Sequence, residues 1–280
     1  MSMIVLAAAV AAANPTPQAA IAAYGEAIAR NDPAMLARAF QPSAIMYCIR
    51  NGAIRATYQA QWKTRMRTET PVAGSNSTKI DWLDQGADTA LARVAAVRGD
   101  KAFTDYLLLA RIGDSWRVIG KLCQADARDI PASRAAVSAV IDTKLASDRA
   151  WDTALLAASI DQRALVMTVE DSELVAATLA EWQARYVDRR ATSPGNAVIE
   201  TSRMIDARGD IGVARWSFRA RDGSEWTDRA LVTRTPAGWR MMALVFVKEP
   251  ATARGPARRS LFSPSPAASP STPNTPSASP

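Results

Sequence analysis

Apolar residues recur at helical spacing in two separate stretches of the chain. The first stretch contains Ile21, Tyr24 and Ile28, and the second contains Val137, Val140, Ile141 and Leu145. A spacing of three or four residues places such side chains on one face of an α-helix. Each stretch leads into a helix-capping pattern, Asn-Asp-Pro-Ala at 31–34 and Ser-Asp-Arg-Ala at 147–150, which predicts that a second helix begins there.

The pattern that follows is repeated. Alternating or apolar runs at 44–49 and 164–169 predict strands, and residues 61–65 and 181–185 predict a third helix, with Trp62 and Trp182 at matching positions. From residue 44 to residue 65 the offset between the copies is a constant 120, without a gap. Downstream, the dipeptides Ala-Arg, Thr-Asp and Trp-Arg begin at residues 92, 104 and 116 and recur in the same order at 214, 227 and 239. The chain is therefore predicted to be an internal duplication.

Short turns separate the remaining strand-like stretches of each copy. They contain Gly, Asp or Pro and lie at 86–88, 98–100 and 113–114 in the first copy, and at 208–210, 222–223 and 236–238 in the second. Because short turns join antiparallel neighbours, each copy is predicted to be an α+β domain with three helices packed on a curved, mostly antiparallel sheet. The expected order is a leader at 1–17, domains at 18–127 and 134–249, and a tail at 250–280.

The two ends differ in composition from the rest of the chain. Residues 1–13 are an apolar run that ends in an A-x-A pattern and resembles a signal peptide, although it lacks a basic residue at its start. A periplasmic or secreted protein is expected, or a cytoplasmic one if the leader is not a signal peptide. The Pro/Ser/Ala-rich tail is expected to be disordered. No later run is long enough to span a bilayer.

The net charge and the content of Cys and His argue against several classes of function. The net charge of +7 comes from basic residues scattered over both copies, so nucleic-acid binding is not expected. The absence of His excludes His-based triads and His-ligated zinc, and no metal or cofactor motif is present. Cys48 and Cys123 fall on the first and last main strands of the first copy, where they can bond only if those strands are adjacent. Two buried thiols are the favoured alternative.

Two motifs suggest a family. The order of elements, with Phe-Thr-Asp-Tyr at 103–106 entering a strand and Gly-Asp-Ser-Trp-Arg-Val-Ile at 113–119 closing the copy, resembles the nuclear transport factor 2-like superfamily over residues 18–248. Within this superfamily the chain resembles the lumazine-binding-like subfamily more than it resembles the SnoaL-like cyclases. This resemblance implies cone-shaped α+β barrels around an apolar pocket, with or without catalysis, and domains that often dimerise through their sheets. The tandem copies are therefore expected to form a pseudo-dimer within one chain.

Candidate site residues concentrate in the first copy. In ketosteroid isomerase, a relative by this resemblance, a carboxylate moves the proton and a Tyr helps to hold the oxyanion. The catalytic candidates on this pattern are Tyr47, Asp81 and Asp105. The ligand-binding candidates are Tyr24, Tyr47, Tyr58, Trp62, Arg93 and Asp105. The tyrosines have an alternative role as rim or core residues. At the positions aligned with Tyr24, Tyr47 and Tyr58, the second copy has Val140, Met167 and Thr178. A pocket is therefore expected in the first copy.

An Arg–Asp pair is expected in each copy. A hairpin folded about Gly99 places Arg93 directly opposite Asp105, and a hairpin centred between 221 and 222 places Arg215 opposite Asp228. The pair is interpreted as structural, with a ligand anchor as the alternative.

Three functions remain open. The preferred one is an exported, noncatalytic module that binds a small apolar molecule or a protein partner. The second is an isomerase, dehydratase or cyclase that uses Tyr and Asp groups of the first copy, which requires Tyr24, Tyr47, Tyr58 and Asp81 to converge on one cavity. The third is a cell-envelope assembly or scaffold protein that uses the Pro/Ser-rich tail and the outer faces of the sheets.

Overall fold

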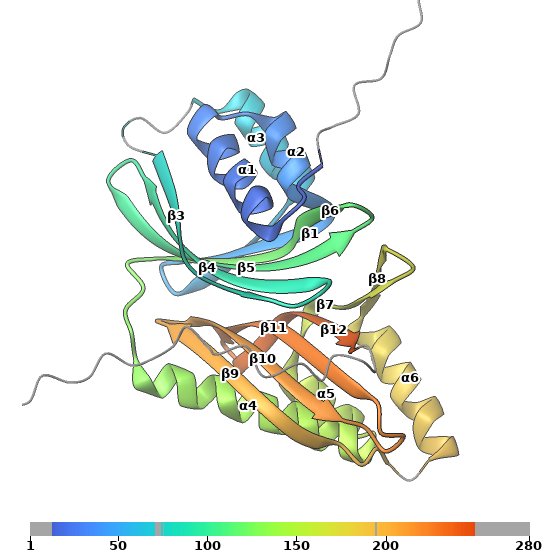
Figure 1. Ribbon diagram of the computed structural model, residues 1–280. Helices are drawn as coiled ribbons and strands as arrows, with labels where there is room; N and C mark the ends of the chain where they lie inside the picture. Colours follow the sequence, from blue (N-terminus) through green and yellow to red (C-terminus); the bar gives the residue numbers. More distant parts are fainter. Residues whose placement is uncertain (1–12, 71–73, 75, 194, 250–280) are drawn as a thin grey trace, which may run out of the picture. The chain divides into compact units, whose positions relative to one another are not determined.

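The computed structural model describes residues 13–70, 74, 76–193 and 195–249 (Figure 1). These residues belong to one compact unit that extends to Glu249. Most of the predicted leader (residues 1–12 of 1–17) and the whole predicted disordered tail (residues 250–280) lie outside the described residues. Within the described part, no helix is long and apolar enough to cross a bilayer.

The first half of the chain forms one sheet and three helices. Its elements are α1 (Pro17–Arg30), α2 (Pro33–Ala39), β1 (Phe40–Arg50), β2 (Ala53–Tyr58), α3 (Gln59–Thr68), β3 (Asn76–Gln85), β4 (Thr89–Arg98), β5 (Lys101–Ile112) and β6 (Ser115–Ala125). The strand order is β2-β1-β6-β5-β4-β3, and β1 and β6 are parallel whereas the other neighbours are antiparallel.

The second half repeats this arrangement. Its elements are α4 (Pro131–Ala150), α5 (Thr153–Ser159), β7 (Ile160–Glu170), β8 (Glu173–Thr178), α6 (Leu179–Thr192), β9 (Ile199–Arg208), β10 (Ile211–Arg219), β11 (Glu225–Thr235) and β12 (Gly238–Lys248). The strand order β8-β7-β12-β11-β10-β9 is the same as in the first half. The α+β class and the duplication are therefore confirmed.

The positions of the helix caps correct one part of the predicted alignment between the two copies. Asp32 caps α2 by accepting hydrogen bonds from two backbone N–H groups, and Asp152 caps α5 in the same way. Ser147 and Asp148 lie inside α4, so the prediction that they form a cap is wrong. The offset of 120 thus extends back through the helices, and the counterpart of Tyr24 is Lys144. The expected counterpart, Val140, is one helical turn away, a shift that apolar periodicity cannot detect.

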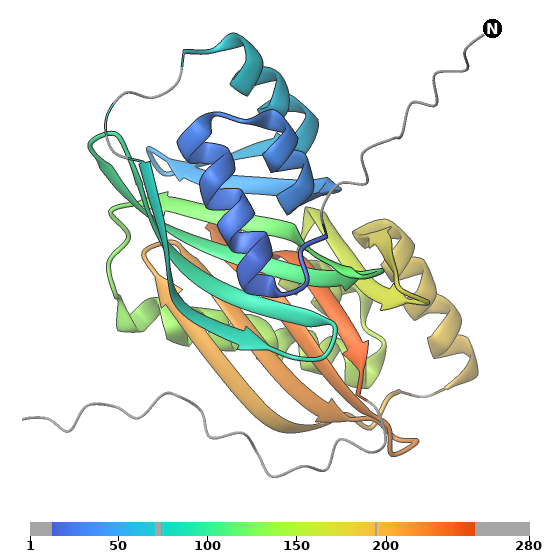
Figure 2. The ribbon, with the colours of Figure 1, turned by 45° about the horizontal axis from the view of Figure 1, so that its top comes forward.

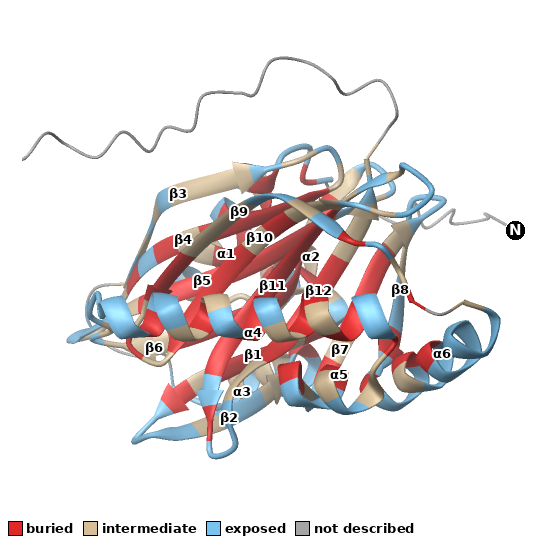
Figure 3. Cartoon of the chain, turned by 90° about the horizontal axis from the view of Figure 1, so that it is seen from below, coloured by how far each residue is buried: buried red, intermediate tan, exposed pale blue. Residues whose placement is uncertain are grey.

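The helices cover one face of each sheet, and the two helix-free faces pack against each other (Figures 1 and 2). One core cluster lies beneath α1–α3 and a second beneath α4–α6. A third cluster joins the sheets and includes Tyr47, Tyr106 and Leu108 from the first half and Met167 and Leu231 from the second. In Figure 3 the central strands of both sheets are coloured as buried, whereas much of the outer surface of α4 is coloured as exposed. Both faces of the central strands are therefore covered.

Polar contacts also cross between the sheets. The Asp206 Oδ2 atom on β9 accepts hydrogen bonds from Trp82 Nε1 (3.1 Å), Arg93 Nη1 (2.7 Å) and Tyr106 Oη (2.7 Å). All three donors belong to the first half. In the opposite direction, Arg229 of β11 donates to Thr89 Oγ1 at 2.7 Å. The two halves are thus joined by buried polar pairs as well as by apolar packing.

The strand register contradicts the expected Arg–Asp pairs. In the β4–β5 hairpin Arg98 pairs with Lys101, so the turn has two residues and Arg93 lies opposite Tyr106 rather than Asp105. The prediction assumed a turn centred on Gly99, whereas the centre lies between Gly99 and the next residue. A slip of one residue moves a side chain to the other face of the sheet. Asp105 therefore faces the helices, and Arg93 faces the second sheet.

The same error occurs in the second half. The β10–β11 loop spans residues 220–224 and is centred on Asp222, so Arg215 lies opposite Arg229 and Trp216 lies opposite Asp228. Both arginines approach Asp84 of the first half, at 3.1 and 3.5 Å. The expected pair of Arg215 with Asp228 is wrong.

Candidate functional site

A cavity of about 1440 Å³ lies mainly in the first half, and Asp210 of the second half also borders it. It is bordered by α1, α3, the β1–β2 hairpin and the helix-facing side of β4, β5 and β6. Much of its wall is apolar and includes Ile28, Met46, Trp62, Met66 and Phe103. Trp62 is held in place by edge-to-face contacts with Tyr24 and Phe40, at centroid distances of 6.0 and 5.6 Å. The cavity thus has a fixed aromatic wall.

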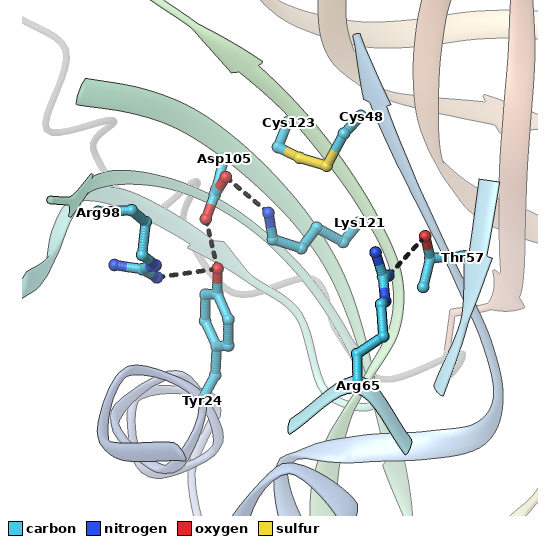
Figure 4. The surroundings of a disulfide bond; sticks show 8 residues. All are labelled: Tyr24, Cys48, Thr57, Arg65, Arg98, Asp105, Lys121 and Cys123. Atoms are coloured by element: carbon cyan, nitrogen blue, oxygen red, sulfur yellow. Dashed lines mark hydrogen bonds and ion pairs between the residues drawn. A yellow bond between two sulfur atoms is a disulfide. The ribbon is translucent and has the colours of Figure 1, made fainter. Parts of the chain in front are cut away.

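A buried polar cluster forms part of the cavity wall (Figure 4). The hydroxyl of Tyr24, on α1, donates to Asp105 Oδ2 at 2.6 Å, and Lys121 Nζ, on β6, donates to Asp105 Oδ1 at 2.6 Å. Asp105 is 1% exposed and Lys121 is 4% exposed. Burial and the neighbouring carboxylate raise the pKa of Tyr24 well above 10, which keeps its hydroxyl protonated. Burial lowers the pKa of Lys121, and the attraction of Asp105 opposes this effect.

Two arginines at the cavity are held by neutral acceptors. Arg98 Nη1 donates to the carbonyls of Ser77 and Val97 at 2.9 and 2.7 Å, and its Nη2 donates to the Tyr24 hydroxyl at 3.2 Å. Arg65, on α3, donates to the hydroxyl of Thr57 at 3.0 Å. Both guanidinium groups therefore have defined positions at the cavity (Figure 4).

A disulfide closes the wall beside this cluster. Cys48 of β1 and Cys123 of β6 are direct neighbours in the parallel register, with Cα atoms 4.5 Å apart, and they form a disulfide bond. The condition that their strands be adjacent is met, and the favoured alternative of two buried thiols is wrong. Cys123 also lies opposite Asp105 on β5. The disulfide thus fixes β1 against the strand that carries Lys121.

The predicted site residues do not converge. Tyr24, Trp62 and Asp105 border the cavity. Tyr47 lies on the other face of its strand, where its hydroxyl donates to the carbonyl of Arg163 in the second half at 2.9 Å. Tyr58 ends β2 with 51% of its surface exposed.

The remaining two candidates lie away from the cavity. Asp81 accepts a hydrogen bond from Arg93 at 3.1 Å, and Arg93 also contacts Asp206 of the second half. The catalytic candidates Tyr47 and Asp81 are therefore separated from Asp105, and the arrangement required for an enzyme of the predicted kind is not observed.

Lys121, Arg98 and Arg65 are not among the site residues predicted from the sequence. A signal for Lys121 was present, because it is the one charged residue within the apolar run from Val118 to Cys123. A lone Lys in a buried strand requires a carboxylate partner, which points to Asp105. Arg98 and Arg65 carried no comparable signal, because each lies among other polar residues.

The chemistry open to this cluster is limited. Both oxygens of Asp105 accept hydrogen bonds, and the proton of the Tyr24 hydroxyl is directed at Asp105. A general base needs a free oxygen within reach of a substrate proton. The cluster is therefore suited to presenting fixed charge rather than to proton transfer. Among the described residues, no group of three His, Cys, Asp or Glu side chains is placed to hold a metal ion.

The second half fills the corresponding space. Trp151, Tyr186 and Phe246 stand where the first half has Asn31, Met66 and Cys123, and all three pack in or against its core cluster. The ring of Trp182 packs against the tilted rings of Phe246 and Tyr186, at centroid distances of 5.3 and 6.5 Å. Positions that border the cavity in the first half are thus core positions in the second.

A different buried cluster replaces the polar group of the first half. Lys144, at the position of Tyr24, donates to both oxygens of Asp148 at 2.6 and 2.7 Å, and the Tyr186 hydroxyl also donates to Asp148. Asp228, at the position of Asp105, is 3% exposed. Its Oδ1 atom has no hydrogen-bond partner among the described residues.

Asp228 is expected to make stability depend on pH. Burial raises its pKa from 3.8 to about 7, with Lys144 and Arg229 opposing the shift and Asp148 adding to it. Between these values the unfolded chain loses the proton while the folded protein keeps it, so stability falls as the pH rises from about 4 to about 7. The contribution is at most roughly 4 kcal/mol.

Urea unfolding at a series of pH values checks this expectation. The stability of Asp228→Asn relative to the wild type should increase from about pH 4 to about pH 7 and then level off. Other carboxylates titrate in both proteins and cancel in the difference. If the free energy of unfolding changed with pH in parallel for the two proteins, Asp228 would be ionised in the folded protein over this pH range.

Comparison with known proteins agrees with this architecture. A family model described as "Putative lumazine-binding" matches residues 14–124, which is nearly all of the first half, and the second half has the same order of elements. This match covers less than half of the whole chain. Comparison with functionally curated proteins finds no match.

Solved structures of nuclear transport factor 2-like proteins are each similar to less than half of the chain. A protein of unknown function from Silicibacter pomeroyi is 19% identical with a TM-score of 0.36, over 39% of this chain and 91% of that chain. One from Shewanella baltica is 15% identical with a TM-score of 0.38, over 44% and 98%. A ketosteroid isomerase-like protein from Erwinia carotovora atroseptica is 18% identical with a TM-score of 0.34, over 39% and 93%.

Proposed function

We propose that the first half binds a small, largely apolar organic molecule in its cavity and that the second half is its structural partner. The contrast between the halves carries this proposal. Equivalent positions border an open cavity in one half and form a packed aromatic core in the other. Duplicated domains that served only as scaffolds would both gain stability from a filled core.

The geometry favours binding over catalysis. Trp62, Met46 and Phe103 offer flat and adaptable apolar surface, which is typical of sites for small organic molecules. The one carboxylate of the buried cluster, Asp105, is fully occupied by Tyr24 and Lys121. We also propose that the protein acts outside the cytoplasm, and the disulfide supports this because disulfides persist in oxidising compartments.

A neutral fluorescent probe tests the binding proposal. N-phenyl-1-naphthylamine brightens in apolar sites, and titration of the full chain should show saturable binding at one site. Trp62→Ala removes the aromatic wall and should weaken binding about tenfold or more, since losing the contact area of a Trp costs on the order of 1.5–3 kcal/mol. Trp226→Ala is the matched control, because Trp226 is also half-buried but lies in the second half.

Two results would contradict the proposal. The first is the absence of saturable binding to the folded protein. The second is an equal loss of affinity in the Trp62 and Trp226 variants, which would place the probe elsewhere.

A further inference from the structure

The buried cluster at the cavity carries more positive than negative charge. Lys121 and Arg98 are two cations, and they share a single carboxylate, Asp105, through the direct contact of Lys121 and through the Tyr24 hydroxyl that links Arg98 to Asp105. Tyr24 remains neutral. The cluster therefore has a net charge of +1. Because buried charges are normally compensated, this excess favours an additional anion nearby.

The arginines at the cavity differ from those between the sheets. Arg93, Arg215 and Arg229 each contact a carboxylate of Asp206 or Asp84. In contrast, the acceptors of Arg98 and Arg65 are carbonyls and hydroxyls, and in the part of the chain that the structure describes neither forms an ion pair. The three arginines between the sheets are thus neutralised by carboxylates, whereas Arg98 and Arg65 at the cavity are not.

The second half does not share the positive excess. There a single cation, Lys144, is paired with the carboxylate of Asp148, and the acidic side chain of Asp228 lies nearby. The position of Lys121 is taken by Leu244, a core residue. Of the two buried clusters, the one beside the open cavity therefore carries the positive excess, which links this excess to the occupant of that cavity.

We propose that the ligand of the first half is an organic anion, with an acidic group bound by Arg98 and Lys121 and an apolar, aromatic body packed against Trp62. Arg65, on α3, adds a third positive charge on the wall beside Trp62. Guanidinium groups in fixed positions suit the planar or trigonal oxygens of carboxylates and sulfonates. This inference rests on the proposed function, since it names the chemical class of the molecule bound in the same cavity.

Two probes with the same aromatic rings test the role of the charge. 8-Anilinonaphthalene-1-sulfonate is an anion, whereas N-phenyl-1-naphthylamine lacks the sulfonate. The anionic probe should bind the full chain at one site at least tenfold more tightly, and its affinity should decrease as salt is added. Arg98→Met should reduce the affinity for the anion about tenfold or more and change that for the neutral probe less than twofold.

Two further variants complete the design. Arg65→Met should weaken binding of the anion about threefold, and it carries the same test if Arg98→Met does not fold, because Arg65 makes only one hydrogen bond in the described structure. Arg219→Met is the matched control, since Arg219 lies exposed in the second half, paired with Glu225. Circular dichroism and thermal unfolding establish that each variant is folded.

The outcomes separate the two proposals. If the neutral probe binds and the anion binds no better, the charge inference is overturned while the proposed function stands. If neither probe binds, the proposed function fails and the inference fails with it. If the anion binds tightly but with equal affinity to the Arg98, Arg65 and Arg219 variants, it binds outside the cavity and the inference is overturned.

Discussion

Replacement of Asp206 by Ala is expected to lower the free energy of unfolding by about 3–5 kcal/mol, the usual loss when a buried ionic partner is removed. Asp206 accepts three hydrogen bonds from the first half, and its loss leaves the buried Tyr106 hydroxyl without this acceptor and the guanidinium of Arg93 with only Asp81. Urea unfolding followed by circular dichroism measures the change. The same substitution also removes the main polar contact that joins the sheets.

Asp81→Ala provides a matched control for this prediction. Asp81 contacts the same guanidinium of Arg93, but it is exposed, so its removal should cost less than about 1 kcal/mol. Equal effects of the two substitutions would show that the buried contact of Arg93 with Asp206 stabilises the fold no more than its exposed contact with Asp81. A loss below about 1 kcal/mol for Asp206→Ala would show that apolar packing alone joins the halves.

Removal of the disulfide is expected to have a similarly large effect. Cys48 and Cys123 are separated by 75 residues, and in the chain-entropy model a loop of this length stabilises the fold by about 4 kcal/mol. The double variant Cys48→Ala/Cys123→Ala should therefore unfold at a clearly lower urea concentration than the oxidised wild type.

Reduction provides an independent check of the same bond. Dithiothreitol should lower the stability of the wild type to near that of the double variant, whose own unfolding curve should not respond to the reductant. If the double variant were as stable as the oxidised wild type, the disulfide would make no net contribution to the fold.

The sequence predicted the elements and the repeat well but not the strand faces. The caps at Asp32, the turn glycines and the matching Trp62 and Trp182 are local signals, and local geometry decides them. Which face of a strand meets the helices is not a local property. Tyr47 and Cys48 must point to opposite sides, but both sides of β1 are covered, so an apolar pattern does not tell which side is the cavity.

The candidate site was only partly predictable for the same reason. Asp105 and Tyr24 both border the cavity, yet their hydrogen-bond partners depend on the register of β5 against β4 and β6. A turn with one residue more or less reverses every side chain of the hairpin, and the residues around Gly99 are compatible with both lengths. Lys121 joins the site because β6 pairs with β5, where Lys121 lies opposite Leu107, and a register shift between Leu108 and Leu109 sets this alignment.

The packing of the two helix-free faces has a consequence for how such a protein arises. A single copy on its own would expose Tyr106, Leu108 and their apolar neighbours to water, and it would have to find a second copy by diffusion. Joining both copies in one polypeptide replaces that bimolecular encounter by an intramolecular one at a fixed effective concentration. Association then no longer depends on expression level, and each copy is free to diverge, one toward an open interior and the other toward a filled one.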